Sequence, residues 1–486
     1  MKRTLLLLLA ALLVVLGVAL SRALLLEPQP QGIRQAPALE VDQRRVLERL
    51  GAALRIRSIA TREEDAVAEA RLRAMMDFVE ERFRSLQAHC AFERHRRSLV
   101  IRWTGSDATL DPLLLLAHLD VVPVDPATAA DWRFPPFDGE VSAGYVWGRG
   151  ALDDKSSALA MLEAIEHLAL AGFRPTRGVV VALGCDEEIG GEGGAAAQAR
   201  RFEAAGLTPF LVLDEGYGVL EGIVDVVPAP IAGVGVAEKG YLTVELRVAA
   251  AGGHASMPEP QSALGVLAAG LAALEAEPLP ARLDGASAAF FDALAAEMPF
   301  GPKVLFANRW LTEPVLRGLL EAEPSTAALL RTTTAVTQAN AGVAENVLPQ
   351  SATATVNFRV HPRDSVADVV AHVVRVIDDE RVEVRQLDGA REPTPTSPSE
   401  GEAWDLLADT IRECYEGVVV APALVLGGTD ARHYQDLSAN VYRFNGVRLG
   451  PEDLARIHGA NERIATKNYI EMIRFYARLI ENASRL

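Results

Sequence analysis

The arrangement of apolar and polar positions up to about residue 236 predicts an α/β domain. Three short apolar runs that do not alternate with polar residues, at 113–118, 177–186 and 209–216, are flanked by Gly, Pro or charge. Such runs are typical of strands buried on both faces, as in a parallel sheet. Helical periodicity lies between and before them. It is clearest at 156–172, which ends at a glycine as helices commonly do. Two more helices are predicted at 40–56 and 62–87.

The pattern changes at about residue 237. The segments 240–250 and 352–362 alternate like half-exposed strands, and 382–387 adds a third. Helical patterns at 264–276 and 365–379 separate them, which predicts a small α+β domain inserted into the first. Residues 280–330 do not follow this plan, and we expect a largely helical insertion there. The Pro-rich stretch 391–400 marks the return to the first domain, where 404–415 is again helical.

The first residues have the pattern of a targeting segment. Lys2 and Arg3 precede an almost unbroken apolar run from Leu5 to Leu20. The run is slightly long for the apolar core of a signal peptide and slightly short for a membrane-spanning helix, and no clear A-x-A cleavage site follows. We favour an uncleaved membrane anchor over a cleaved signal. In both cases the remainder lies outside the cytoplasm, on the periplasmic or extracellular side.

The predicted organisation follows from these patterns. A signal or anchor segment is expected at 1–26 and a Pro/Gln-rich stalk at 27–39. The first domain is expected at 40–236 and 391–486, with the inserted domain at 237–390.

Composition excludes several classes of protein. Apolar residues make up 49% and charged residues 23% of the 486 residues, which is typical of a globular chain. The net charge of −17, without a basic stripe, argues against nucleic-acid binding. Three cysteines without C-x-x-C spacing argue against a disulfide scaffold or a cysteine zinc site.

Acids and a histidine follow each predicted strand of the first domain. His118 and Asp120 follow the first strand, Glu187 and Glu188 the second, and Asp214 the third. Because sites in open α/β sheets gather at the carboxyl ends of strands, we expect these side chains to share one edge. Crowded carboxylates repel one another, so a cation should lie among them.

Two further segments add candidate ligands. GRGALDDK (148–155) supplies Asp153 and Asp154, and IHGANERI (457–464) supplies His458. Imidazole and carboxylate ligands without sulfur suit a catalytic zinc site. About six ligands exceed the needs of one tetrahedral zinc, but two zinc ions bridged by a carboxylate would use them. Taken singly, each acid pair could also be a helix cap or a surface pair.

The motifs AHLDVVP, GRGALDDK, GCDEEIGG, VLDEG, GGHAS, ENVLP, GGTDARHY and IHGANERI together resemble a known family. They are similar, in family order over roughly 45–480, to the zinc-dependent exopeptidases related to glutamate carboxypeptidase, succinyl-diaminopimelate desuccinylase and aminoacylase. The resemblance implies a catalytic domain with a mixed, largely parallel sheet covered by helices on both faces. It also implies an inserted α+β, ferredoxin-like lid. Length, N-terminal segment and lid insertion most resemble carboxypeptidase S and the secreted enzyme that makes and hydrolyses N-fatty-acyl amino acids.

The resemblance implies a role for each residue of the metal centre. His118 and Asp214 would bind one zinc ion, Glu188 and His458 the other, and Asp153 would bridge them. Cobalt or manganese could substitute for zinc. Asp120 would orient the His118 ring, and Glu187 would be the general base. Asp154 would support the metal ligands without binding a metal ion itself.

The resemblance also implies a substrate-binding set. His254 of the lid would stabilise the oxyanion, and in dimeric relatives this histidine comes from the partner subunit. Asn346, Arg359 and the Gly428–Thr429 turn would bind the substrate carboxylate. Arg331 and Arg432 are further candidates for this role that the resemblance itself does not imply. A homodimer through the lid and a single-chain enzyme both remain open.

Three hypotheses about function follow. The first is a carboxypeptidase or dipeptidase that cleaves an amide bond beside a free carboxylate in short peptides. The second is an N-acyl amino acid hydrolase or synthase, for which the apolar segment 299–311 would line an acyl channel or simply pack in the core. The third, from another class, is a non-catalytic peptide-binding protein on the same fold, which predicts loss of the base or of a ligand. None of these residues is missing.

Overall fold

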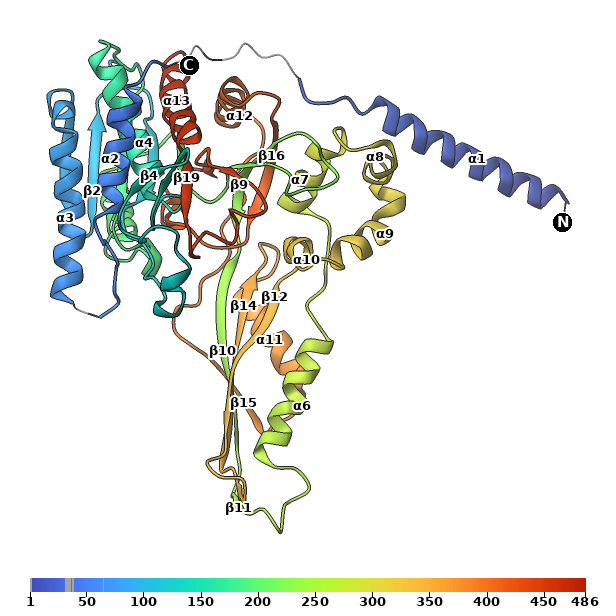
Figure 1. The fold of residues 1–486 in the computed structure, drawn as a ribbon. Coiled ribbons are helices and arrows are strands. Elements are labelled where there is room, and N and C mark those ends of the chain that lie inside the picture. The colour runs from blue at the N-terminus through green and yellow to red at the C-terminus, as the bar shows by residue number, and fades with distance from the viewer. Residues whose placement is uncertain (1, 31–35, 37–38, 64) are drawn as a thin grey trace.

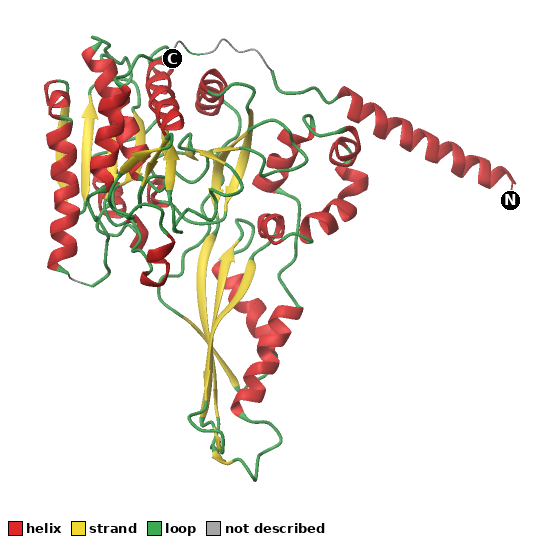
Figure 2. Ribbon diagram, in the orientation of Figure 1, coloured by secondary structure: helices red, strands yellow, loops and turns green. Residues whose placement is uncertain are grey.

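The computed structural model of the chain describes residues 2–30, 36, 39–63 and 65–486. Its body is a large mixed sheet with helices on both faces (Figures 1 and 2). The expected α/β class is confirmed. The strands of this sheet, in spatial order, are β1 (Cys90–His95), β2 (Ser98–Trp103), β6 (Val179–Gly184), β3 (Leu113–His118), β7 (Leu211–Asp214), β17 (Val441–Arg443), β9 (Ile231–Glu238), β8 (Val219–Leu220) and β18 (Arg448–Leu449), with β16 (Val419–Val425) paired to β9.

The central strands β6, β3, β7 and β17 are parallel and buried on both faces. Successive residues of β3 show this directly, because Leu115 packs into one hydrophobic cluster and Leu114 into another on the opposite face. The unbroken apolar run therefore has a physical reason: neither face meets water.

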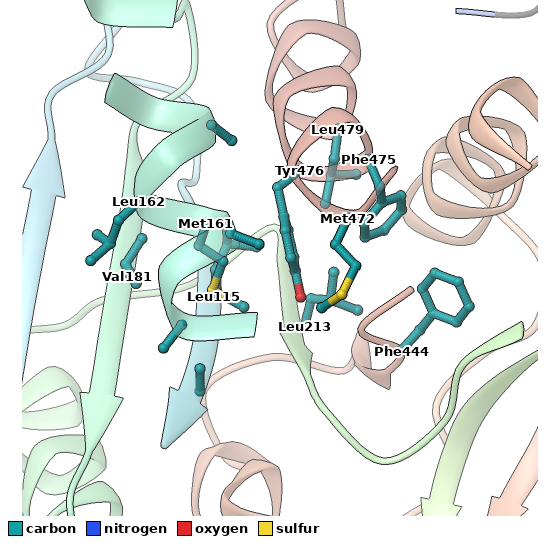
Figure 3. Close-up of a cluster of buried hydrophobic side chains, with 14 of the residues drawn as sticks. Leu115, Met161, Leu162, Val181, Leu213, Phe444, Met472, Phe475, Tyr476 and Leu479 are labelled. Atoms are coloured by element: carbon teal, nitrogen blue, oxygen red, sulfur yellow. The ribbon is translucent and has the colours of Figure 1, made fainter. Parts of the chain in front are cut away.

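The larger cluster joins the sheet to helices that are distant in sequence. Figure 3 shows Leu115 and Leu213 of the sheet beside Met161 of α4 and Met472 of α13. The helices contributing to this cluster are α2 (Gln43–Leu54), α3 (Ala66–Arg82), α4 (Lys155–Leu170), α12 (Glu402–Cys414) and α13 (Thr466–Ala483). The opposite face is covered by α5 (Ala195–Ala204) and the turn at Asp430–Tyr434. A small sheet of β4 (Glu140–Ser142), β5 (Tyr145–Trp147) and β19 (Arg463–Ala465) lies beside the body.

The inserted lid is a separate four-stranded antiparallel sheet that projects from the body (Figure 1). In spatial order its strands are β12 (Thr333–Ala341), β14 (Ser351–Val360), β10 (Gly240–Ala249) and β15 (Val382–Gln386). Helices α6 (Ala263–Ala276) and α11 (Val366–Ile377) pack on one face, around Leu242, Val244 and Phe358. At the far tip, β11 (Gly253–His254) pairs with β13 (Val347–Leu348). The alternating pattern predicted β10 and β14 but not the polar edge strand β12.

The helical insertion consists of α7 (Gly285–Ala295), α8 (Phe300–Ala307), α9 (Arg309–Glu321) and α10 (Pro324–Leu330). It lies within the predicted lid range, but it packs against the body. Phe290, Phe291 and Leu316 form one cluster with Val419 and Ala421 of the sheet strand β16. The insertion is thus an extension of the catalytic body rather than of the lid.

The N-terminal helix α1 (Lys2–Leu25) is long and apolar enough, by length and composition, to cross a membrane. It projects away from the body (Figure 1), and only its last turns are buried, at Ala19 and Ala23. Most of the expected stalk, residues 31–35 and 37–38, lies outside the described residues. Gln29 within that range is attached to the body, since its side chain exchanges hydrogen bonds of 2.8 and 3.1 Å with the backbone of Val420.

Candidate active site

The site lies at the carboxyl ends of three neighbouring strands. β6, β3 and β7 run parallel, so the residues that follow them meet at one edge of the sheet. They deliver Glu187 and Glu188, His118, and the Asp214–Glu215 pair. The loop before α4 adds Asp153, and the turn before β19 adds His458.

Asp153 lies between the two imidazoles. Its Oδ1 is 2.8 Å from His118 Nε2, and its Oδ2 is 3.0 Å from His458 Nε2. The same nitrogen of His458 is 3.4 Å from Glu188 Oε2. One carboxylate facing two imidazoles through separate oxygens is the arrangement expected of a bridging ligand.

The third strand contributes a different side chain from the one expected. The Asp214 carboxylate accepts hydrogen bonds from the backbone N–H groups of Ala431, at 2.6 Å, and Glu215, at 3.0 Å. It is Glu215 that reaches the site, with Oε1 3.5 Å from His118 Nε2. From the sequence, Asp214 was expected to lie beside His118. The strand ends at Asp214, and the chain carries its next side chain to the site.

Asp120 supports two groups at once. Its backbone carbonyl lies 3.0 Å from His118 Nδ1 and its carboxylate 3.5 Å from the same nitrogen. The carboxylate oxygens also accept the backbone N–H groups of Glu187 and Glu188, each at 3.1 Å. Asp120 is fully buried, so it fixes both the imidazole ring and the turn that carries the two glutamates.

Glu187 has the position and the electrostatics of a proton acceptor. Its carboxylate lines the pocket beside Glu188, and Oε1 is 3.6 Å from Arg432 Nη1. Burial raises the pKa of Glu187 to about 8, although the charges of His118 and Arg432 act in the opposite direction. A carboxylate that is held next to a metal site without direct imidazole contact suits general base chemistry.

The cluster fits a pair of metal ions. Ligand atoms of His118, Asp153 and Glu188 lie within 4.8 Å of one another, and so do those of His118, Asp154 and Glu215. Glu188 Oε1 is buried and has no hydrogen-bond partner among the described residues. Contacts with the carboxylates of Asp153 and Glu188 raise the pKa of His458 to about 10. Negative charge is in excess here, as a cation site requires.

Glu462 ties the two ligand loops together. Its buried carboxylate accepts the backbone N–H groups of Leu152, at 2.8 Å, and Asp153, at 3.2 Å, and pairs with Arg149 at 2.7 Å. Arg149 in turn donates to the carbonyl of His458 at 3.0 Å. His458 has a left-handed backbone (φ 60°), which this contact helps to hold. The motif around His458 contains Glu462, but the sequence alone gave it no role.

A polar cavity of about 660 Å³ opens on one side of the cluster, and its wall carries four arginines and four acids. Arg359, Arg391 and Arg432 line it together with Glu187 and His458. Arg359 and Arg391 lie over the same Tyr241 ring, at 5.1 and 5.6 Å. Sequence reasoning missed Arg391, which lies in the link after the lid and reaches the site only when the chain folds back.

The Gly428–Thr429 turn borders this cavity. A Cβ on Gly428 would lie 3.4 Å from the Arg432 guanidinium and 3.9 Å from that of Arg391, which are ordinary contact distances, so both arginines lie beside this turn. The hydroxyl and N–H of Thr429 are used by Glu238, at 2.6 and 3.2 Å. Arg331, one of the further candidates, pairs instead with Glu321 of the helical insertion.

A second cavity of about 370 Å³ lies on the other side of Gly427 and Gly428. Asp153 and Glu215 stand at its polar end. Its remaining wall is mostly apolar and consists of Leu152, Tyr217, Val425, Leu426, Val447, Leu449 and Ile457, with Thr429 and Asn445 among the exceptions. The acid and imidazole cluster is therefore placed between an arginine-lined polar cavity and an apolar one.

The lid tip carries two expected residues far from this cluster. His254 and Asn346 are neighbours at the tip, where Ala255 N–H donates to the Asn346 carbonyl at 3.1 Å. Eight residues of strand, about 26 Å at ~3.3 Å per residue, separate the Tyr241–Arg359 pair from the Ala249–Ser351 pair. His254 lies beyond that point and is exposed. Within one chain the structure does not bring these two residues to the site.

Comparison with known proteins identifies the family. The profile of peptidase family M20/M25/M40 matches residues 114–482. The chain belongs to this family. Members of this metallopeptidase family depend on metal, in agreement with the acid and imidazole cluster. The resemblance inferred from the motifs is confirmed, and so is the assignment as a metallopeptidase-type hydrolase.

Relatives with curated names cover most of the M20 chain. It is 42% identical over 392 residues to the probable carboxypeptidase S-like 2 of Dictyostelium discoideum, covering 80% of this chain and 75% of the relative. It is 38% identical over 449 residues to the N-fatty-acyl-amino acid synthase/hydrolase PM20D1 of Xenopus tropicalis, covering 91% and 87%. It is 32% identical to carboxypeptidase S of Saccharomyces cerevisiae, covering 84% and 78%.

Solved structures share the fold. The M20 family metallo-carboxypeptidase Sso-CP2 from Sulfolobus solfataricus superimposes with a TM-score of 0.67 at 19% identity, covering 92% of this chain and all of that one. This likeness supports the expected catalytic body with an inserted lid at the level of fold.

Proposed function

We propose that this M20 chain hydrolyses the amide bond of a small substrate whose free carboxylate lies next to the scissile bond. The observation that carries the proposal is the placement of the acid and imidazole cluster between a polar cavity, where Arg359, Arg391 and Arg432 gather, and an apolar cavity. A carboxylate bound by the arginines would leave the adjacent amide at the cluster, with the acyl or N-terminal part of the substrate directed into the apolar cavity.

Five side chains would hold two Zn²⁺ ions. His118 and Glu215 would bind one, Glu188 and His458 the other, and Asp153 would bridge them. Asp214, which accepts hydrogen bonds from backbone N–H groups, would support these ligands without binding metal. Cobalt or manganese could replace zinc. Bound zinc polarises a carbonyl and lowers the pKa of water to near 7.

Glu187 would take the proton from the attacking water and later pass it to the leaving amine. Arg432, 3.6 Å from Glu187, keeps this carboxylate directed into the cavity. Asp120 fixes the turn that carries it. The presence of the base beside a full ligand set favours an enzyme over a non-catalytic binding protein on the same fold.

His254 would stabilise the oxyanion from the lid of a second subunit. The tip is too far from the site of its own chain, but it is exposed and carries exposed apolar residues, Met257 and Val343. The outer edge of β12 has no strand partner among the described residues, and such edges are templates for pairing with another chain. A homodimer joined through the lids would place one chain's His254 and Asn346 at the other's site.

Two substrate classes remain, short peptides and N-acyl amino acids. The curated relatives include enzymes named for each. The apolar cavity beside Asp153 and Glu215 favours N-acyl amino acids, because an acyl chain has no polar groups to satisfy there. No residue of the segment 299–311 lines either cavity, and its Phe300 and Trp310 are exposed, so the apolar cavity rather than this segment supports the acyl-chain proposal.

Arg391→Leu is expected to lower kcat/KM for N-oleoyl-leucine by about 10²-fold or more, because a charge-assisted contact with the substrate carboxylate is lost from a partly closed cavity. The same substrate with its carboxylate converted to an amide should be cut poorly by the wild type and no worse by the variant. Steady-state kinetics with both compounds, and with Gly-Leu, measure the loss and rank the two substrate classes.

Arg385→Leu is the matched control, since Arg385 is an exposed arginine of the nearby lid strand β15 that pairs with Glu245. It should leave kcat/KM unchanged. Wild-type turnover that ignores the substrate carboxylate would contradict the proposal.

For the N-terminal segment, we propose an uncleaved anchor that holds the enzyme on the outer side of the membrane. The support is the basic start at Lys2 and Arg3 and the apolar, exposed length of α1.

A further inference from the structure

The outer face of the helical insertion is apolar where a surface helix is normally polar. On α9, Leu311, Val315 and Leu319 follow one another at four-residue spacing and are 49%, 57% and 59% exposed. Trp310 beside them is 59% exposed, and Phe300 of α8 is 52% exposed. We call these five residues the insertion patch.

Packing within the chain does not explain the patch. The inner face of α9 already buries Leu316, with Leu320 against the same cluster, and these residues attach the helix to the body. A surface helix needs only one such apolar stripe, and its other positions are usually polar. Here a second apolar row, Leu311, Val315 and Leu319, runs next to the buried one.

The patch is continuous with the N-terminal helix. The last turns of α1 pack on α8, where Asn308 donates to the Ala19 carbonyl at 2.9 Å and Arg22 to the Ala307 carbonyl at 3.0 Å. Figure 1 shows α8 and α9 at the side of the body from which α1 projects. A membrane that holds α1 would therefore begin where α8 and α9 lie.

The two arginines of α9 are paired with acids rather than free to bind anions. Arg309 contacts Asp292 at 2.6 Å, and Arg317 contacts Glu321 at 3.5 Å. With a net charge of −17, the chain would be repelled by an anionic membrane surface. An exposed tryptophan beside aliphatic residues instead suits the interface of a zwitterionic bilayer.

We propose that the insertion patch docks on the surface of a phosphatidylcholine-type bilayer, beside the point where α1 enters it. Docking fixes the orientation of the body relative to the bilayer. Attachment through α1 alone would only tether it. Docking also places the insertion between the bilayer and the apolar cavity, because Tyr217 and Leu449 of that cavity pack against the same hydrophobic cluster as α7–α9. The docking proposal rests on the proposed membrane anchor at α1 and on the exposed residues of α8 and α9, and it is independent of the proposed substrate.

The test uses the full chain in phosphatidylcholine vesicles with a bimane label on Leu319→Cys or, as the matched control, on Val67→Cys. Both positions are exposed, Val67 at 57% and on α3 at the side of the body away from α1 (Figure 1), and the native cysteines are buried. The label at 319 should be quenched by nitroxide-bearing lipid and shielded from iodide. The label at 67 should show the opposite.

Two outcomes would overturn the proposal. Equal iodide quenching at both positions would mean that the patch faces water. Shielding at 319 from iodide without quenching by the lipid would mean that protein, such as a second copy, covers it. Trp310 provides a label-free repeat, since brominated lipid should quench wild-type emission more strongly than that of Trp310→Phe.

Discussion

Replacing Glu187 with glutamine is expected to lower kcat by about 10²–10⁴-fold, the usual contribution of a positioned general base. The amide keeps the size of the side chain and its place on the turn held by Asp120. It cannot accept the proton from water. Metal content should therefore stay at the wild-type value while turnover of N-oleoyl-leucine or Gly-Leu is lost, as measured by amino-acid release and elemental analysis of the same sample.

Glu192→Gln is the matched control. Glu192 lines the same cavity but is exposed and far less constrained. Its replacement should leave kcat within the error of the wild type. A Glu187→Gln enzyme that keeps its turnover would remove Glu187 from the role of base.

Mixing two inactive variants is expected to restore activity. His254→Ala removes the oxyanion donor, at a cost of about 10²–10³-fold in kcat, and Glu187→Gln removes the base. In a dimer whose lid tips cross over, the mixed species has one site with an intact Glu187 and the partner's intact His254. Random exchange makes half of the dimers mixed, so about a quarter of wild-type activity should return.

The control for this experiment is a mixture of Glu187→Gln with Glu188→Gln. In both variants the defect lies in the part of the site that the body, not the lid, contributes. Every site in that mixture lacks one of the two glutamates, so no activity should return. If the His254→Ala mixture is equally inactive, although co-purification through a tag on one variant shows mixed dimers, His254 does not act across subunits.

The sequence predicted those parts of the fold whose environment is uniform. β3 is buried on both faces, so its apolar run shows no alternation, and β10 has one buried face, so it alternates. The edge strand β12, TTAVTQANA, is mostly exposed and has neither signature. The packing of the insertion on β16 is a contact between segments about a hundred residues apart, which local periodicity does not encode.

Site residues could be predicted from the sequence where they belong to a recognisable motif. They were harder to predict where the tertiary fold determines which side chain reaches the site. His118 and Asp153 come from motifs whose order indicates one metal centre. The choice between Asp214 and Glu215 depends on which side chain faces the site at the end of β7, and both are acidic. Arg391 reaches the cavity only through the return of the chain from the lid. For His254, the motif indicates a function, but the length of the lid strands decides which subunit it can serve.

The most direct test of the account is the metal content of the full chain and of two neighbouring variants. We expect two zinc ions per chain in the wild type, about the same in Asp214→Asn, and a loss of about one ion in Glu215→Gln, because the Glu215 carboxylate faces His118 and the Asp214 carboxylate faces backbone amides. Elemental analysis after dialysis against a weak chelator gives these numbers. A wild type without bound metal, or loss of metal from Asp214→Asn but not from Glu215→Gln, would contradict the proposed two-metal site.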